Sequence, residues 1–201
     1  MRQITSWIIG LVAVATPALW HVQAQGRLDG RGADRRFVSQ RYGFSIAVPS
    51  AWNVSVQKDT PMYVNFSSSA GLSQLTLPPG GASIVVVARD TLPSQGRLGR
   101  TLSQWAEGDA KEITTNPPSA TPFEMPRESG VLGALTCSYD VATFSPDEQP
   151  QHSVSVYWEF KGKQFAAHLT YVVNERNAAM LERTFAETVR SIRPIESGRL
   201  P

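Results

Sequence analysis

Two runs of alternating apolar residues near the C-terminal end constrain the fold of this chain most strongly. The runs span residues 154–160 and 165–173, and Lys161-Gly162-Lys163 follows the first of them. Such alternation has the period of a β-strand with one buried face. A two-residue loop would bring both apolar faces to the same side, whereas a three-residue loop in a plain hairpin would put them on opposite sides. We therefore expect a tight hairpin over residues 154–173.

Other segments show the same strand period. Residues 42–48 alternate heavy apolar side chains with small ones, and Pro49 ends that run because proline cannot donate to a β-ladder. Residues 84–88 are apolar without a break, which indicates a central strand covered on both faces. Further strands are predicted over residues 52–56, 62–66 and 129–144. The sheet should therefore contain about six or seven strands.

Two segments have the period of an amphipathic helix. The first spans residues 101–114, where Thr101 is a plausible N-cap and Gln104 lies three residues on, the spacing of a capping box. The second runs from about residue 177 to 192, with Asn177 as its expected cap. Its apolar stripe has helical spacing and consists of Leu181, Phe185, Val189 and Ile192.

The order of these elements predicts the fold class. No strand–helix–strand alternation runs through the chain, so we expect an α+β fold with helices packed on a mainly antiparallel sheet. A single domain is expected over residues 37–193. A flexible Gly- and Arg-rich leader at 25–36 should precede it, and a tail at 194–201 should follow. Residues 116–126 contain four prolines and are expected to form a loop, not an element.

The first 24 residues have the pattern of a secretory signal peptide. Arg2 supplies the positive charge, residues 7–19 an apolar segment, and Val22-Gln23-Ala24 a small-residue cleavage signal. We expect cleavage between Ala24 and Gln25. The alternative, an uncleaved membrane anchor, would need ~20 apolar residues to cross the bilayer. Export to the periplasm or secretion is therefore predicted, without stable membrane insertion after cleavage.

Export to an oxidising compartment makes the cysteine count informative. Cys137 is the only cysteine, so no internal disulfide can form and stability must come from the core. A buried, inert thiol is the main interpretation, and pairing between two chains is the alternative. The formal net charge is +2 with no long basic run, so charge gives no support for a nucleic-acid partner.

The sequence lacks the motifs of common catalytic and metal sites. It contains no G-x-S-x-G, H-E-x-x-H or C-x-x-C, and residues 80–83, the nearest match to the first, are interpreted as a loop entering a strand. His152 and His168 are interpreted as packing residues, with a ligand or base role for His168 as the alternative. Tyr63 and Tyr157 fall on lighter strand faces, where they would line a partner site or lie under a helix. We predict no catalytic, cofactor-binding or metal-binding residues.

The segment Tyr42-Gly43-Phe44-Ser45-Ile46, with Val48-Pro49 and Trp52, resembles the opening of PsbP-like domains. This family includes the extrinsic photosystem II subunit and secreted bacterial relatives such as the DcrB-like proteins. The closing pattern is similar too, through residues 157–171 and a last helix ending at Ser191-Ile192. The resemblance covers most of residues 37–193 and implies an α/β/α sandwich around an antiparallel sheet. It implies no catalytic residues, because the family shares no catalytic motif.

These observations predict an exported, non-enzymatic accessory or protein-binding module of the cell envelope. The expected partner is another envelope or secreted protein, as the resemblance implies, and no cofactor is expected. The alternative function is a carrier of a small apolar ligand, held in a cleft between the sheet and the loop at residues 116–126.

Overall fold

The computed structural model describes residues 26–57, 63–68, 77, 80–89, 101–114, 118–141, 149–173 and 176–195. The predicted signal peptide at residues 1–24 and its cleavage site between Ala24 and Gln25 lie outside the described residues. So does the part of the predicted tail beyond residue 195.

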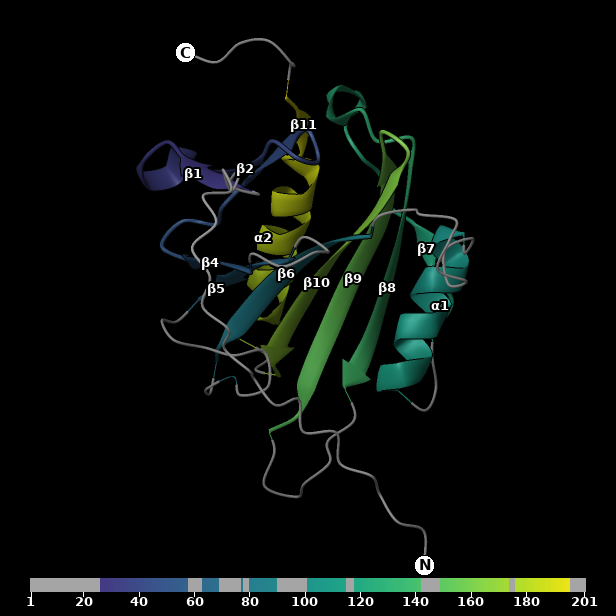
Figure 1. The fold of residues 1–201 in the computed structure, drawn as a ribbon. Helices are drawn as coiled ribbons and strands as arrows, with labels where there is room; N and C mark the ends of the chain where they lie inside the picture. Colours follow the sequence, from purple (N-terminus) through teal and green to yellow (C-terminus); the bar gives the residue numbers. More distant parts are fainter. Residues whose placement is uncertain are drawn as a thin grey trace, which may run out of the picture.

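Seven of the described strands form an antiparallel sheet at the centre of the molecule (Figure 1). Each strand pairs with its neighbour in the antiparallel direction. In spatial order the strands are β4 (Asn53–Gln57), β5 (Tyr63–Ser67), β6 (Ala82–Arg89), β10 (Lys163–Val172), β9 (Gln151–Phe160), β8 (Gly133–Val141) and β7 (Thr121–Pro122). The central position predicted for residues 84–88 is confirmed, since β6 lies between β5 and β10.

Strands β9 and β10 form the tight hairpin that their alternation predicts. A two-residue turn joins them, and both turn residues have positive φ, 48° at Lys161 and 70° at Gly162, as in the favoured hairpin turns. The register pairs Trp158 with Phe165, whose rings stack 5.5 Å apart. The two apolar faces therefore lie on the same side of the sheet.

The two described helices lie on opposite faces of this sheet. Helix α1 (Leu102–Ile113) packs against β8 and β9, and α2 (Ala178–Arg190) packs against β10 and the second sheet (Figure 1). The main core lies on the α2 face, and its helical part is the predicted stripe, since Leu181, Phe185, Val189 and Ile192 are all buried. The α+β class, with helices on both faces of a mainly antiparallel sheet, is confirmed.

The starts of the two helices differ from each other. At α1 the predicted capping box is present, because the Thr101 side chain accepts from the Gln104 backbone N–H at 3.2 Å and the Gln104 side chain accepts from the Thr101 N–H at 3.0 Å. At α2 Asn177 is the N-cap residue as expected, but its side chain makes no capping hydrogen bond. Its own backbone is already near-helical, with φ −116° and ψ −12°, which is not the extended geometry that a capping side chain needs.

A second, four-stranded sheet was not predicted. Its order is β1 (Arg27–Asp29), β2 (Arg36–Ser39), β3 (Phe44–Ala47) and β11 (Arg193–Pro194), and it is also antiparallel. The predicted strand at residues 42–48 therefore exists as β3, but outside the main sheet. Its heavy face is buried as expected, since Tyr42, Phe44, Ile46 and Val48 all belong to the main core.

Short strands lie in both segments that were expected to flank the domain. The segment expected as a flexible leader, residues 25–36, contains β1, a 3-10 turn at Gly32–Asp34 and the start of β2. Pro194, expected in the tail, pairs with β3 as part of β11. Such short strands have no readable period, and side chains such as Arg36 hold them. Its guanidinium donates to the Ser191 carbonyl at 2.5 Å and to Ser45 Oγ at 3.1 Å.

The proline-rich segment 116–126, expected to lack regular structure, contains one short strand and is followed by a 3-10 turn. Strand β7 pairs with β8, and a 3-10 turn follows at Arg127–Ser129. Phe123 and Met125 pack against the main core, and the Arg190 guanidinium lies 5.0 Å from the Phe123 ring. Packing against the main core and backbone pairing with β8 therefore fix this segment. Neither could be inferred from the prolines in the sequence.

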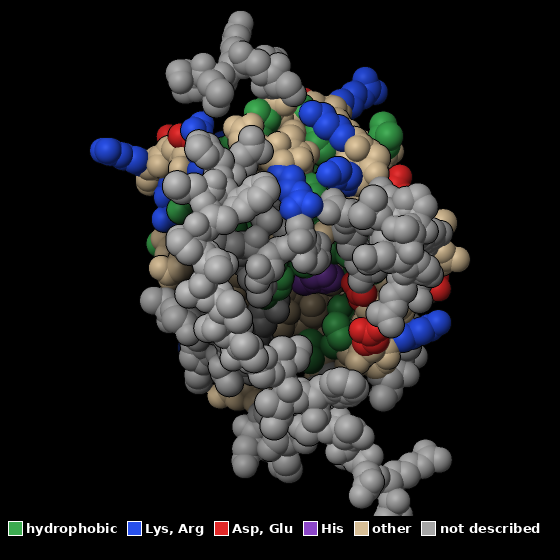
Figure 2. All heavy atoms as spheres, viewed as in Figure 1, with side chains coloured by type: hydrophobic (Ala, Val, Ile, Leu, Met, Phe, Trp, Pro, Cys, Tyr) green, Lys and Arg blue, Asp and Glu red, His purple; other side chains and the backbone are tan. Residues whose placement is uncertain are grey.

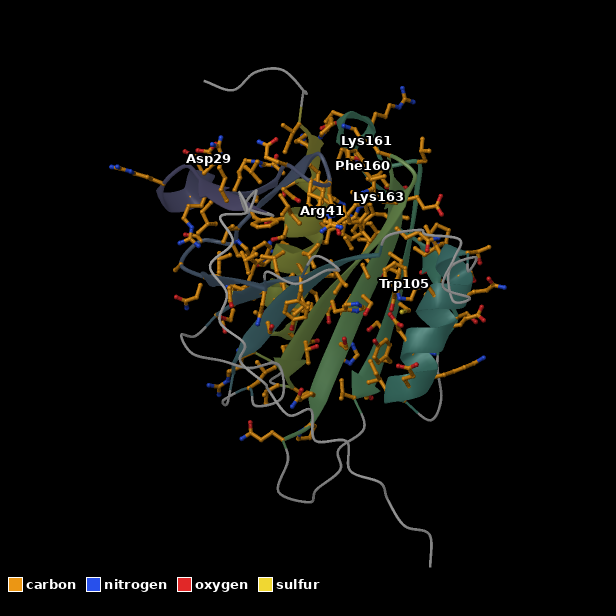
Figure 3. The ribbon with its side chains drawn as sticks, viewed as in Figure 1. Asp29, Arg41, Trp105, Phe160, Lys161 and Lys163 are labelled. Carbon is orange, nitrogen blue, oxygen red and sulfur yellow. The ribbon has the colours of Figure 1, made fainter. Side chains whose placement is uncertain are left out.

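The hairpin end is tied to the second sheet by cations over aromatic rings. Lys163 Nζ lies 4.7 Å from the centre of the Tyr42 ring, and the Arg41 guanidinium lies 5.4 Å from it. Lys161 Nζ lies 5.3 Å from the Phe160 ring. Figure 3 shows Arg41, Lys161 and Lys163 gathered at this end of the molecule. Of the three contacts, the one between Lys163 and Tyr42 links β10 to the segment that enters β3.

Candidate functional site

The sheet face that carries α1 is polar where a covered sheet face is usually apolar. Alternation along each strand assigns the main core to one face, so the intervening residues point to the α1 face. Five polar residues on this face are nevertheless buried. They are Asn65, Ser67, Ser83, Ser153 and Ser155. Buried polar side chains are uncommon away from hydrogen-bonded sites, so this face is the candidate functional site.

The register brings these residues together from distant parts of the chain. Asn65 of β5 lies opposite Val85 of β6, and Val85 lies opposite His168 of β10. His168 in turn faces Ser155 of β9, which faces Cys137 of β8. One lateral row across five strands therefore combines an amide, an imidazole, a hydroxyl and a thiol.

Hydrogen bonds fix the side chains of this row. Ser155 Oγ and His168 Nδ1 are 2.8 Å apart, and the Tyr139 hydroxyl is 3.4 Å from Ser155 Oγ. Ser83 Oγ donates to Asn65 Oδ1 at 2.7 Å. The floor of the site is therefore held in one arrangement before any partner arrives.

Helix α1 forms one wall of the site. Trp105, which Figure 3 shows pointing from α1 toward the sheet, meets the Tyr157 ring edge-on at 5.2 Å. The Tyr157 hydroxyl donates to Asp109 Oδ2 at 3.3 Å, and its ring meets His168 edge-on at 5.7 Å. Burial, with the negative charge of Asp109, raises the pKa of Tyr157 and keeps its hydroxyl protonated. Tyr157 therefore lies under a helix, the second of its two predicted placements.

The surface is hollowed beside α1. Figure 2 shows a histidine side chain at the floor of this hollow, with acidic side chains at one side of it. His168 is the described histidine on the α1 face, and it is half-buried. Helix α1 contacts β8 and β9, and no described helix or strand lies over the β4–β6 part of this face. His168 is the partly exposed member of the polar row, whereas Asn65, Ser155 and Cys137 are buried.

The structure also shows where the other candidate residues from the sequence lie. Tyr63 is half-buried on the α1 face, next to Asn65 on β5. Ser83 lies inside β6 with its hydroxyl bonded, so the interpretation of residues 80–83 as a loop entering a strand is confirmed. Cys137 is buried, and burial raises the pKa of its thiol to about 11. His152 lies on the opposite face of the sheet, away from the hollow.

The structure also assembles a group that sequence analysis missed. His152 Nδ1 lies 2.8 Å from Asp140 Oδ1, and its Nε2 lies 2.6 Å from Ser138 Oγ. The signal in the sequence is weak, because Ser138 and Asp140 are two residues apart and their partner comes from another strand. Only the β8–β9 register, which pairs Asp140 with His152, brings the three together.

Metal sites and membrane-spanning helices can be assessed for the described part of the chain. No group of three or more His, Cys, Asp or Glu side chains there is placed to hold a metal ion. No helix there has both the length and the apolar character needed to cross a membrane.

Comparisons with known proteins give likeness to solved structures only. No protein-family model matches the chain, and no curated protein matches it. A Bacteroides thetaiotaomicron VPI-5482 crystal structure matches with TM-score 0.43 and 14% identity. The match covers 83% of this chain and 50% of the other. A Pseudomonas aeruginosa protein of unknown function matches with TM-score 0.41 and 12% identity, covering 86% of this chain and 99% of the other.

A third solved structure is the Ran-binding protein Mog1p of Saccharomyces cerevisiae. It matches with TM-score 0.45 and 11% identity, covering 76% of this chain and 90% of that protein. The resemblance to PsbP-like domains stays a prediction.

Proposed function

We propose that this protein is an exported binding module that receives a polar group of another envelope or secreted protein in the hollow beside α1. One observation carries the proposal: a row of hydrogen-bonded polar side chains is built into a hollowed sheet face. Few, fixed polar groups in a concave surface are typical of binding sites. The signal-peptide pattern of residues 1–24 supports the exported location.

The chemistry of this face favours binding over catalysis. The Ser155 hydroxyl, which contacts His168, belongs to a fully buried residue, so a substrate would not reach it. The raised pKa of Cys137 keeps its thiol protonated at neutral pH, and a protonated thiol is a poor nucleophile. His168 is half-buried on the α1 face, and an imidazole can both donate and accept hydrogen bonds. A partner's polar side chain or chain end therefore suits the His168 imidazole, the partly exposed group of the row.

The alternative, a small apolar ligand beside the proline-rich loop, has less support. Phe123 and Met125 of that loop pack against the main core, so the protein's own side chains cover that side of the sheet. Polar groups lie on the other face, where the surface is hollowed. An apolar ligand would remove water from these groups without replacing the lost hydrogen bonds. A polar partner therefore fits better than an apolar one.

Capture experiments with two matched histidine variants test this proposal. Tagged mature protein, starting at Gln25, is incubated with envelope extract from its own source, as wild type, His168→Gln and His152→Gln. We expect one protein to recur with wild type and with His152→Gln, whose change lies on the opposite face. His168→Gln should recover at least ~10-fold less of it, the effect of about 1.4 kcal/mol.

Two outcomes would count against the proposal. One is equal recovery with His168→Gln and wild type, with both proteins folded by circular dichroism. The other is a small molecule bound in native mass spectra of freshly purified wild type and lost in His168→Gln, which would make the hollow a small-ligand site.

A further inference from the structure

Ser138, His152 and Asp140 form a hydrogen-bonded chain on the sheet face opposite the hollow. Asp140 Oδ1 lies 2.8 Å from His152 Nδ1, and His152 Nε2 lies 2.6 Å from Ser138 Oγ. A hydroxyl on a base that a third group orients is the arrangement of an activated nucleophile. We propose that Ser138 is a nucleophilic serine that accepts an acyl group from an ester. In this proposal His152 is the general base and Asp140 a positioning residue.

The backbone and a neighbouring ring hold His152 in place. Asp140 lies directly opposite His152 in the β8–β9 pair, and Ser138 is two residues from Asp140 on the same face of β8. On its other side the imidazole meets the Tyr171 ring at 5.6 Å. The Tyr171 hydroxyl donates to Glu182 Oε1 of α2 at 2.7 Å, which fixes that ring. The His152 side chain is 21% exposed, so its base is oriented yet reachable.

The proton path follows from the two hydrogen bonds. A carboxylate at Nδ1 favours the tautomer that carries its proton there, which leaves Nε2 to accept. As Ser138 Oγ bonds to the ester carbonyl carbon, its proton moves to Nε2 of His152. The leaving alcohol departs with that proton, and an acyl-serine remains. Water attacks this ester by the same route and releases the carboxylic acid.

The backbone N–H of Ser138 can supply one hydrogen-bond donor for the negative charge that develops on the oxygen of the attacked carbonyl. The Ala134 carbonyl accepts from the Phe123 N–H on the side of β8 away from β9. Backbone groups alternate in direction along a strand, so the Ser138 N–H points to that side as well. Strand β7 pairs only with Leu135 and Thr136, so no described strand pairs with β8 at Ser138 there. This N–H can donate to the oxygen of an attacked carbonyl.

The openness of the site sets the class of substrate. Ser138 and Asp140 are exposed, and the Asp140 side chain is 89% exposed, so no described part of the chain encloses a substrate and water screens the carboxylate. With one backbone donor and no enclosing pocket, the expected reaction is slow acylation by esters with good leaving groups. This activity is separate from the binding proposed for the opposite face.

The chain contains two internal controls. Ser155 also contacts a histidine, His168, but it is fully buried. Ser55 is exposed on a strand, as Ser138 is, and it faces Asn65 across the β4–β5 pair. If exposure alone decided reactivity, Ser55 and Ser138 would react equally. If contact with an imidazole alone decided it, Ser155 would react as well.

Fluorophosphonate labelling tests the proposal, since the probe phosphonylates activated serines with loss of fluoride. The folded full-length mature protein is labelled over time, and the modified serines are located by peptide mass spectrometry. We expect Ser138 to be labelled at least ~100-fold faster than Ser55, the size of a general-base effect, and Ser155 to stay unlabelled. Equal labelling of Ser138 and Ser55 in the wild type would overturn the proposal, and this comparison needs no variant.

Variants then separate the roles of the histidine and the carboxylate. His152→Gln should lower the Ser138 labelling rate to that of Ser55, and Ser138→Ala should remove the label and the hydrolysis of p-nitrophenyl acetate. Asp140→Ala should slow the labelling of Ser138, whereas Asp140→Glu should label at the wild-type rate. Both variants should keep the thermal unfolding midpoint of the wild type. Labelling of Ser138 that does not depend on His152 would contradict the assigned base.

Discussion

Cys137 is held as a neutral thiol by its place between the sheet and α1. The residue is 4% exposed, and burial raises its pKa from 9.0 to about 11. A hydrogen bond with Tyr157 works against this shift, and the charge of Asp109 adds to it. The burial predicted for this thiol is confirmed, and it favours an inert role over pairing between chains.

This shift predicts a loss of stability in alkali. In the unfolded chain the thiol loses its proton near pH 9, whereas in the folded protein it keeps that proton until about pH 11. Deprotonation therefore favours the unfolded chain, and the free energy of unfolding should fall by about 2–3 kcal/mol between these pH values. Urea unfolding at each pH measures it. In Cys137→Ala this part of the pH dependence should vanish, and equal slopes in the two proteins would contradict the assignment.

At the residue scale, sequence could predict burial but not neighbours. The lighter-face positions of His168 and Tyr157 follow from strand alternation. That His168 meets Ser155, and that Ser138 and Asp140 meet His152, depends on the β8–β9–β10 register. Register follows from the turn only within the β9–β10 hairpin. The β8–β9 connection is longer, so the Ser138–His152–Asp140 group could not be foreseen.

At the scale of elements, local pattern was a good guide wherever an element was long enough to show a period. The β9–β10 hairpin, the α1 capping box and the apolar stripe of α2 were all predictable for this reason. The two- and three-residue strands β1, β7 and β11 were not. Such strands exist because partners supply backbone hydrogen bonds, and those partners lie far away in sequence.

Helix α2 provides a direct test of the stripe. Phe185 is 1% exposed in the main core, whereas Met180, on the same helix, is 53% exposed. Phe185→Ala should lower the free energy of unfolding by ~3–5 kcal/mol, since it removes a buried ring and leaves a cavity. Met180→Ala should change it by less than ~0.5 kcal/mol. Denaturant unfolding of both variants measures the difference, and similar losses would mean that α2 packs by another face.

At the scale of the whole molecule, the two faces of the main sheet differ in what covers them. The α2 face contains the main core under the helix and the second sheet, and it is exposed at Ser138 and Asp140 on β8. The α1 face is covered by the helix over β8 and β9 and is hollowed beside it (Figure 2). Sequence predicted that both faces are covered, but the polar row became visible only when the strands were placed in order.

The sequence of the whole chain also predicts processing. The protein recovered from its native compartment should begin at Gln25, because Val22-Gln23-Ala24 provides the cleavage signal. Intact mass and N-terminal sequencing measure this. A protein that keeps residues 1–24 would instead support a retained N-terminal anchor.

The central claim is that the hollow beside α1 is the binding surface. A photo-crosslinking side chain in place of Tyr63, which is half-buried on the α1 face, tests it most directly. The same group in place of Met180, exposed on α2, is the control. In cells exporting the protein, irradiation should join one partner protein to the Tyr63 variant and not to the Met180 variant. Joining at Met180 alone, or equally at both positions, would contradict the account.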